Sequence, residues 1–207
     1  MSRPHEDIRH HTPTDHRTGG PATAFAQASW WAVTVVHVTA QRAAAALASY
    51  ETLVEQARAS TPKSREAALL ESHNRRRVMV LLNLDGHEAF RHLTAAWDEH
   101  HLLAERHAVD ESHSLELYRV VTTGGEAAID PASTDAYAFE HVPAIERIEA
   151  LIADVVAAPG FRGVVIFAND AGAHIILYRF ANAEAIDTLR ATPGADRYAV
   201  RPVRTFG

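Results

Sequence analysis

The chain contains no cysteine. It therefore cannot form disulfides, use a thiolate nucleophile, or build a cysteine-based zinc or iron–sulfur site. No apolar run approaches the roughly 18–20 residues that a membrane-spanning helix needs. The N-terminus also lacks the apolar segment of a secretion signal. Together these absences predict a cytoplasmic protein with no membrane partner.

An excess of positive charge is also missing. Lys and Arg number 20 against 26 Asp and Glu, so the formal net charge is −6. This balance gives no reason to expect a nucleic-acid partner. Hydrophobic residues make up 47% of the 207 residues, which is typical of a globular protein with one large or two small domains. Histidine is abundant, with 14 copies, and it is the side chain that titrates near neutrality.

The N-terminal residues 1–28 are polar, rich in Pro, Thr, Gly and His, and without periodicity, which predicts a disordered tail. After it, hydrophobic patterns predict the element order βαββαβ twice. The first set has strands at 30–38, 66–71, 77–84 and 113–121, with helices at 40–58 and 86–107. The second set has strands at 137–142, 161–168, 173–180 and 197–206, with helices at 144–157 and 183–191.

Short sequence matches support an internal repeat. The segment His37-Val38-Thr39-Ala40 matches His141-Val142-Pro143-Ala144, and Glu88-Ala89-Phe90 matches Glu184-Ala185-Ile186. We therefore predict an α+β fold of two tandem ferredoxin-like repeats, packed sheet to sheet as an internal pseudo-dimer. Repeat 1 spans 29–121, a linker spans 122–134, and repeat 2 spans 135–207. Because repeat 2 has the shorter second helix, repeat 1 is expected to be the working half and repeat 2 the scaffold.

The helix predicted at 86–107 carries an unusual apolar stripe. Phe90, Trp97 and His101 recur at helical spacing, which suggests the wall of a pocket between this helix and the first sheet. We expect His37, on the same strand face as Trp31 and Val35, to reach into that pocket. The remaining candidate substrate-binding residues are His100, His107 and Tyr118. His141 repeats His37 but has no evident partner on a helix, so a structural role is favoured for it.

Three segments, WWAVTVVHV, RVMVLLNLDGHEAFRHL and ELYRVV, resemble the antibiotic biosynthesis monooxygenase superfamily. The resemblance implies the dimeric α+β barrel fold. It also implies a cofactor-free oxygenase that acts on a phenolic or polyketide-type natural product with molecular oxygen, as a monomer or homodimer. Trp97 would be the pocket indole, and His37 and His101 would be polar partners of the phenol, one of them its base. The chain departs from the family because the first strand lacks an Asn at its pocket end.

Two alternatives remain open. Heme-degrading relatives carry a Trp and a heme-ligating His ten residues apart on this helix, and Trp97 and His107 have that spacing. The chain would then bind heme. The same cavity could also serve a non-oxidative cyclase or a non-catalytic small-molecule binding protein. No firm metal-ligand spacing is present, so we predict no metal site.

Overall fold

The computed structural model describes residues 20–61, 66–95, 115–142, 148–187 and 196–207. The strands are β1 (Thr23–Ala24), β2 (Trp30–His37), β3 (Ala67–Ser72), β4 (Arg77–Leu84), β5 (Leu115–Gly125), β6 (Ala128–Ile129), β7 (Ala136–Val142), β8 (Phe161–Ala168), β9 (His174–Phe180) and β10 (Asp196–Phe206). The helices are α1 (Ala43–Ser60), α3 (Ile148–Val156) and α4 (Ala183–Asp187), and residues 87–95 are also helical. None of the described helices is both long and apolar enough to cross a membrane.

The two halves of the chain have the same strand order. In the first, the strands lie side by side as β3-β4-β2-β5, and in the second as β8-β9-β7-β10. Each order places the first strand of the repeat between its third and fourth strands. The prediction of two tandem ferredoxin-like repeats is therefore confirmed.

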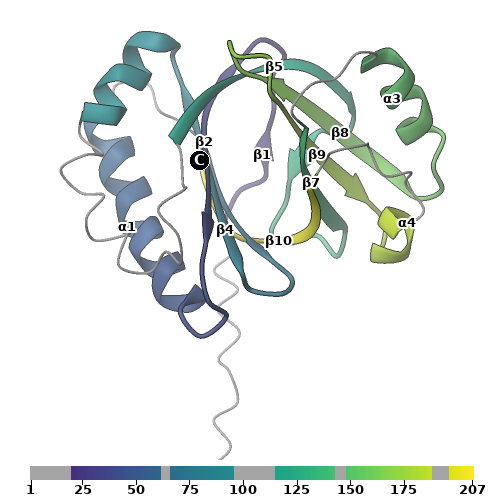
Figure 1. Ribbon diagram of the computed structural model, residues 1–207, viewed down its shortest axis with the longest axis horizontal. Coiled ribbons are helices and arrows are strands. Elements are labelled where there is room, and N and C mark those ends of the chain that lie inside the picture. The colour runs from purple at the N-terminus through teal and green to yellow at the C-terminus, as the bar shows by residue number, and fades with distance from the viewer. Residues whose placement is uncertain (1–19, 62–65, 96–114, 143–147, 188–195) are drawn as a thin grey trace, which may run out of the picture.

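The repeats join through two antiparallel seams, β5 with β8 and β10 with β3, which close an eight-stranded barrel. The pairings make β2 and β7 run in the same direction, so a pseudo-two-fold axis lies along the barrel. Closure leaves none of these eight strands with an open edge. In Figure 1, α1 lies on one side of the barrel and α3 and α4 lie on the opposite side.

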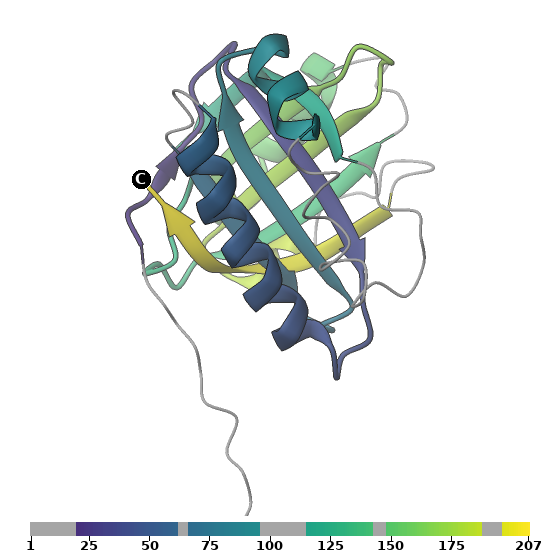
Figure 2. The same ribbon diagram turned by 90° about the vertical axis from the view of Figure 1, so that its left-hand side faces the viewer.

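Side chains of β2 alternate between two different cores. Ala32 and Val36 pack outward in the cluster that contains α1, whereas Trp31 and Val33 pack inside the barrel. Figure 2 shows α1 lying across the outside of the sheet. The predicted orientation of this strand is therefore wrong, because the face that carries His37 was expected to look toward the helices. Both faces of β2 are apolar, so alternation alone did not distinguish them.

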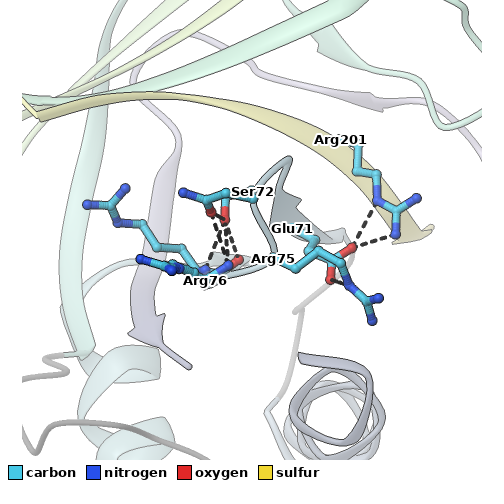
Figure 3. A network of polar contacts seen from close by, with 7 residues as sticks. Glu71, Ser72, Arg75, Arg76 and Arg201 are labelled. Carbon is cyan, nitrogen blue, oxygen red and sulfur yellow. Dashed lines mark hydrogen bonds and ion pairs between the residues drawn. The ribbon is translucent and has the colours of Figure 1, made fainter. Parts of the chain in front are cut away.

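A polar network marks the seam between β3 and β10. The Glu71 carboxylate is fully buried and accepts from Arg201 Nε and Nη2 at 2.9 and 2.6 Å. Arg75 Nε donates to its other oxygen at 3.2 Å. Figure 3 shows the two guanidinium groups reaching this carboxylate from different parts of the chain. Because Glu71 belongs to repeat 1 and Arg201 to repeat 2, the network ties the halves together.

A small two-stranded sheet, β1 with β6, plugs one end of the barrel. Phe25 follows β1 and is 5% exposed, with its ring 4.7 Å from Trp31 and 5.4 Å from Phe167. The predicted boundaries differ from the structure here. Residues 20–28, assigned to the disordered tail, include β1, and the predicted linker includes the end of β5 and all of β6. Residues 1–19 lie outside the described part of the chain.

Candidate functional site

The described residues line a pocket of about 190 Å³ at the barrel end opposite the plug. Its floor is apolar, formed by Val33, Val35 and Ile175, and its rim is polar. The remaining lining residues are His37, Arg77, Glu116, Tyr118, His141, Asp196 and Tyr198. Sites that enclose a drug-sized ligand are larger, roughly 300–1,000 Å³. This pocket therefore suits a small aromatic molecule, or one end of a larger molecule that protrudes into solvent.

The barrel geometry explains why two repeat-related histidines meet here. His37 ends β2, and His141 is the penultimate residue of β7. Because β2 and β7 run in the same direction, their C-terminal ends lie at the same mouth of the barrel. Every second side chain of a strand points to the same face of the sheet. Val35 and Phe139, which lie two residues earlier, point into the barrel, so His37 and His141 lie on the inward face as well. The pocket thus contains two imidazoles contributed by equivalent positions.

Arg77, at the start of β4, contacts the other polar side chains of one wall of the pocket. Its Nη2 donates to Asp196 Oδ2 at 2.7 Å, and its guanidinium carbon lies 4.2 Å from the centre of the Tyr198 ring. The Tyr198 ring in turn stacks on Phe139 with centroids 5.7 Å apart. Burial, together with the nearby Asp196 carboxylate, raises the pKa of Tyr198 well above its usual range, although Arg77 opposes this. Tyr198 is therefore a neutral phenol near neutral pH.

On the other wall, Glu116 of β5 accepts hydrogen bonds from two neighbouring side chains. Its Oε2 accepts from the Tyr118 hydroxyl at 2.8 Å and from Asn169 Nδ2 at 2.8 Å. Asn169 is itself held in place because its Oδ1 accepts from the backbone N–H of Ala173 at 2.8 Å. Burial is the main reason that the pKa of Tyr118 is raised far above its usual range, with Glu116 adding to it. Tyr118 consequently stays protonated and donates to the carboxylate.

The structure brings some of the predicted site residues together and separates others. His37, Val35 and Tyr118 line the pocket. Trp31 lies deeper, fully buried, with its Nε1 donating to Ser29 Oγ at 2.8 Å, and it is not among the residues that line this pocket. Phe90 packs in the outer cluster with α1, on the other side of the sheet.

Four of the predicted residues, Trp97, His100, His101 and His107, lie outside the described residues, and so does most of the helix predicted at 86–107. The cavity expected between that helix and the first sheet stays a prediction. The start of this helix is described, and Leu93 packs against the outer face of the sheet, away from His37. His101 lies outside the described residues, so its predicted convergence with His37 stays a prediction.

Sequence reasoning missed Arg77, Glu116, Asp196 and Tyr198, because all four lie outside the helix predicted at 86–107. It also favoured a structural role for His141, which lines the pocket. The signal that was available is the repeat match between His37 and His141. Because the pocket takes residues from both repeats, it does not follow the expected division into a working half and a scaffold half.

Among the described residues, no group of three or more His, Asp or Glu side chains is placed to hold a metal ion.

No protein-family model matches the sequence, and no curated protein is significantly similar to it. Several solved structures are similar in fold to this chain. An anthrone oxidase-like protein is 12% identical with a TM-score of 0.70, over 89% of this chain and 95% of that one.

A proposed monooxygenase from Fusobacterium nucleatum is 8% identical with a TM-score of 0.59, over 87% of this chain and 95% of that one. A second, from Lactobacillus acidophilus, is 9% identical with a TM-score of 0.54, over 87% and 96%. The fold is a dimeric α+β barrel. In this chain, one polypeptide supplies both halves of the barrel, so the prediction of fold class is confirmed. At these identities the likeness concerns the fold, and the chemistry has to be argued from the site.

Proposed function

We propose that this dimeric α+β barrel is a cofactor-independent oxygenase that acts on a phenolic aromatic compound at the barrel mouth. The observation that carries the proposal is the pocket itself. There, His37 and His141 meet the Glu116–Tyr118 pair above the apolar floor of a barrel that is plugged at its other end. An apolar pocket with a few convergent polar groups is the usual form of a small-molecule site. The likeness in fold to an anthrone oxidase-like protein agrees with an aromatic substrate.

The proposed reaction begins with loss of the phenolic proton. Tyr118 and Tyr198 are poor acceptors for it because burial holds both in their protonated form. Imidazole is the side chain whose unperturbed pKa is closest to neutrality, so His37 is the proposed base, with His141 as a second polar partner. The phenolate then reduces molecular oxygen directly.

For a substrate with a ring methylene, conversion of CH₂ to C=O releases four electrons. Molecular oxygen accepts them, one of its atoms ends in the new carbonyl, and the other leaves as water. No external reductant is needed for this balance. Val33, Val35 and Ile175 would keep bulk water away from the reacting carbon.

The test is oxygen uptake with a hydroxylated anthrone. The wild-type protein without added cofactor should consume oxygen in proportion to the quinone formed. Replacing the base, His37→Ala, should lower the rate about 10²–10⁴-fold with the melting temperature preserved. His73→Ala is the matched control, because His73 is exposed in the β3–β4 turn and does not line the pocket. Wild-type rates in both His37→Ala and His141→Ala would remove the histidines from the mechanism.

The alternatives give different outcomes in the same experiments. Binding of the anthrone without oxygen uptake would indicate a non-oxidative cyclase or a non-catalytic binding protein. A protein-dependent shift of the absorbance band of added hemin would favour the heme alternative. That alternative depends on Trp97 and His107, which lie outside the described residues.

A further inference from the structure

The pocket has one permanently charged cation among its ten lining residues, Arg77. The side chain is held in position from two directions, by the 2.7 Å hydrogen bond to Asp196 and by the Tyr198 ring beneath it. It is 21% exposed. A guanidinium has five N–H donors, and the bond to Asp196 uses one from Nη2. Donors therefore remain for an acceptor inside the pocket.

The Asp196 side of this ion pair faces water. The Asp196 side chain is 58% exposed, so water screens the ion pair. Exposed ion pairs contribute little to stability, with typical measured values of about 0–1 kcal/mol. The pairing thus fixes the direction of the Arg77 side chain and leaves its other N–H donors for a ligand.

The two walls of the pocket differ in the charge of the ligand group that they favour. On the Glu116 side, Oε2 accepts from Tyr118 and Asn169, so this wall offers a carboxylate. On the Arg77 side the wall offers N–H donors and positive charge. In the described part of the chain, the titratable and charged groups around the space between them are His37, Arg77, Glu116, Tyr118, His141, Asp196 and Tyr198. Among the described lining residues, the permanent positive charge of Arg77 favours a negatively charged ligand oxygen on that side.

We propose that Arg77 binds the ionised oxygen of a phenolic ligand, so that the pocket takes up phenols as phenolates. The proposal rests on the proposed function for its substrate class. It adds a charge-stabilising residue that the histidines cannot replace, because guanidinium keeps its charge at any working pH. A cation within about 4–6 Å of an acidic group lowers the pKa of that group by about 1–3 units. Arg77 would therefore make the phenol easier to ionise before it meets oxygen.

The probe for the test is 4-nitrophenol, whose ionised form absorbs visible light and whose neutral form does not. The pKa of the bound probe is measured by absorbance titration at saturating protein, with binding followed by equilibrium dialysis. We expect the wild-type protein to lower the probe's pKa by about one unit or more. Arg77→Met keeps the aliphatic length of the side chain and should abolish this shift. Thermal melting checks that the variant is folded.

Arg76→Met is the matched control, because Arg76 is the exposed neighbouring arginine and does not line the pocket. It should leave the shift intact. Glu116→Gln removes a negative charge from the opposite wall and should lower the probe's pKa further. An unshifted or raised pKa in the wild-type protein, an equal shift in folded Arg77→Met, or no binding of the probe would each overturn the proposal. A clear Arg77-dependent shift without oxygen uptake from a hydroxylated anthrone would reject the oxygenase function and keep this inference.

Discussion

Glu140 on β7 is fully buried in the second repeat, where a carboxylate needs partners. Its Oε2 accepts from the Tyr178 hydroxyl at 2.7 Å and from Arg197 Nε and Nη2 at 2.8 and 2.7 Å. Burial and then the Glu140 charge raise the pKa of Tyr178 far above its usual range, so this hydroxyl stays a donor. Glu71 in the first repeat is equally buried, but its arginine partners are 45% and 51% exposed.

The two glutamates therefore provide a matched pair of variants. Glu140→Gln removes the buried negative charge that faces Arg197, whose side chain is 17% exposed, and should lower the free energy of unfolding by about 3–5 kcal/mol. Glu71→Gln removes a charge that faces arginines already 45% and 51% exposed to water, so its loss should be nearer to about 1 kcal/mol. Urea denaturation of both variants measures the difference. Equal losses would mean that exposure of the partner does not control the contribution of these pairs.

At the scale of elements, the plug formed by β1 and β6 depends on a few anchors. The N–H of Phe25 donates to the Ala127 carbonyl at 3.1 Å, and the N–H of Ala28 donates to the Val120 carbonyl at 2.9 Å. Near the first of the described residues, Thr205 Oγ1 donates to the Pro21 carbonyl at 2.6 Å. The segment before β2 thus contacts β5 and β10, and Phe25 fills the closed end of the barrel.

We expect Phe25→Ala to lower the free energy of unfolding by about 3–5 kcal/mol, because the lost ring leaves a cavity between Trp31 and Phe167. The measurement is chemical denaturation. Gln27→Ala, at an exposed position of the same segment, is the control and should change stability by less than about 0.5 kcal/mol. If Phe25→Ala behaved like the control, the segment before β2 would not be part of the barrel core.

Gly125 is the last residue of β5 and lies at the β5–β8 seam between the repeats. Its φ is +64°, and a Cβ there would lie 2.2 Å from the Arg162 carbonyl oxygen. Gly125→Ala should therefore destabilise the protein by clearly more than about 1–2 kcal/mol, the usual strain of a left-handed residue alone. Gly172→Ala isolates that strain, because Gly172 has φ +83° and a Cβ added to it would meet nothing within 4 Å. Equal melting temperatures for the two variants would contradict a close contact at the seam.

At the scale of the whole molecule, the barrel buries tyrosines in both repeats. Burial is the largest cause that raises the pKa values of Tyr118, Tyr137, Tyr178 and Tyr198 above the ordinary 10.0. In the unfolded chain these hydroxyls lose their protons near pH 10, whereas in the folded chain they keep them. The folded state therefore binds more protons above that pH, and stability falls as the pH rises.

We predict that the free energy of unfolding declines as the pH rises past about 10, because tyrosinates form first in the unfolded chain. Tyr178→Phe should be less stable than wild type at neutral pH because Glu140 loses a donor, but its decline with pH should be shallower. Urea denaturation from about pH 8 to about pH 11 measures both slopes. An unchanged free energy of unfolding across that range would contradict the prediction.

The local pattern of hydrophobic residues in the sequence was sufficient to predict most of the helices and strands. The strand predicted at 77–84 and the strand predicted at 161–168 match β4 and β8 residue for residue, because both are runs of β-branched and apolar residues bounded by turns. The repeat match of His37 with His141 reflects a true correspondence, since both residues lie at inward positions near the ends of equivalent strands. Composition and the doubled element order were thus enough to predict two ferredoxin-like repeats.

Tertiary structure alone decided which face of β2 looks into the barrel and which residues share its mouth. Trp31 and Val36 are both apolar in the sequence, so hydrophobicity could not say which one meets a helix. Arg77 and Asp196 are far apart in the chain, and their contact exists because the β10–β3 seam closes the barrel. The sequence by itself determined the elements and their repetition, because these depend on local periodicity. The site depends on strand pairing between repeats, which no local pattern encodes.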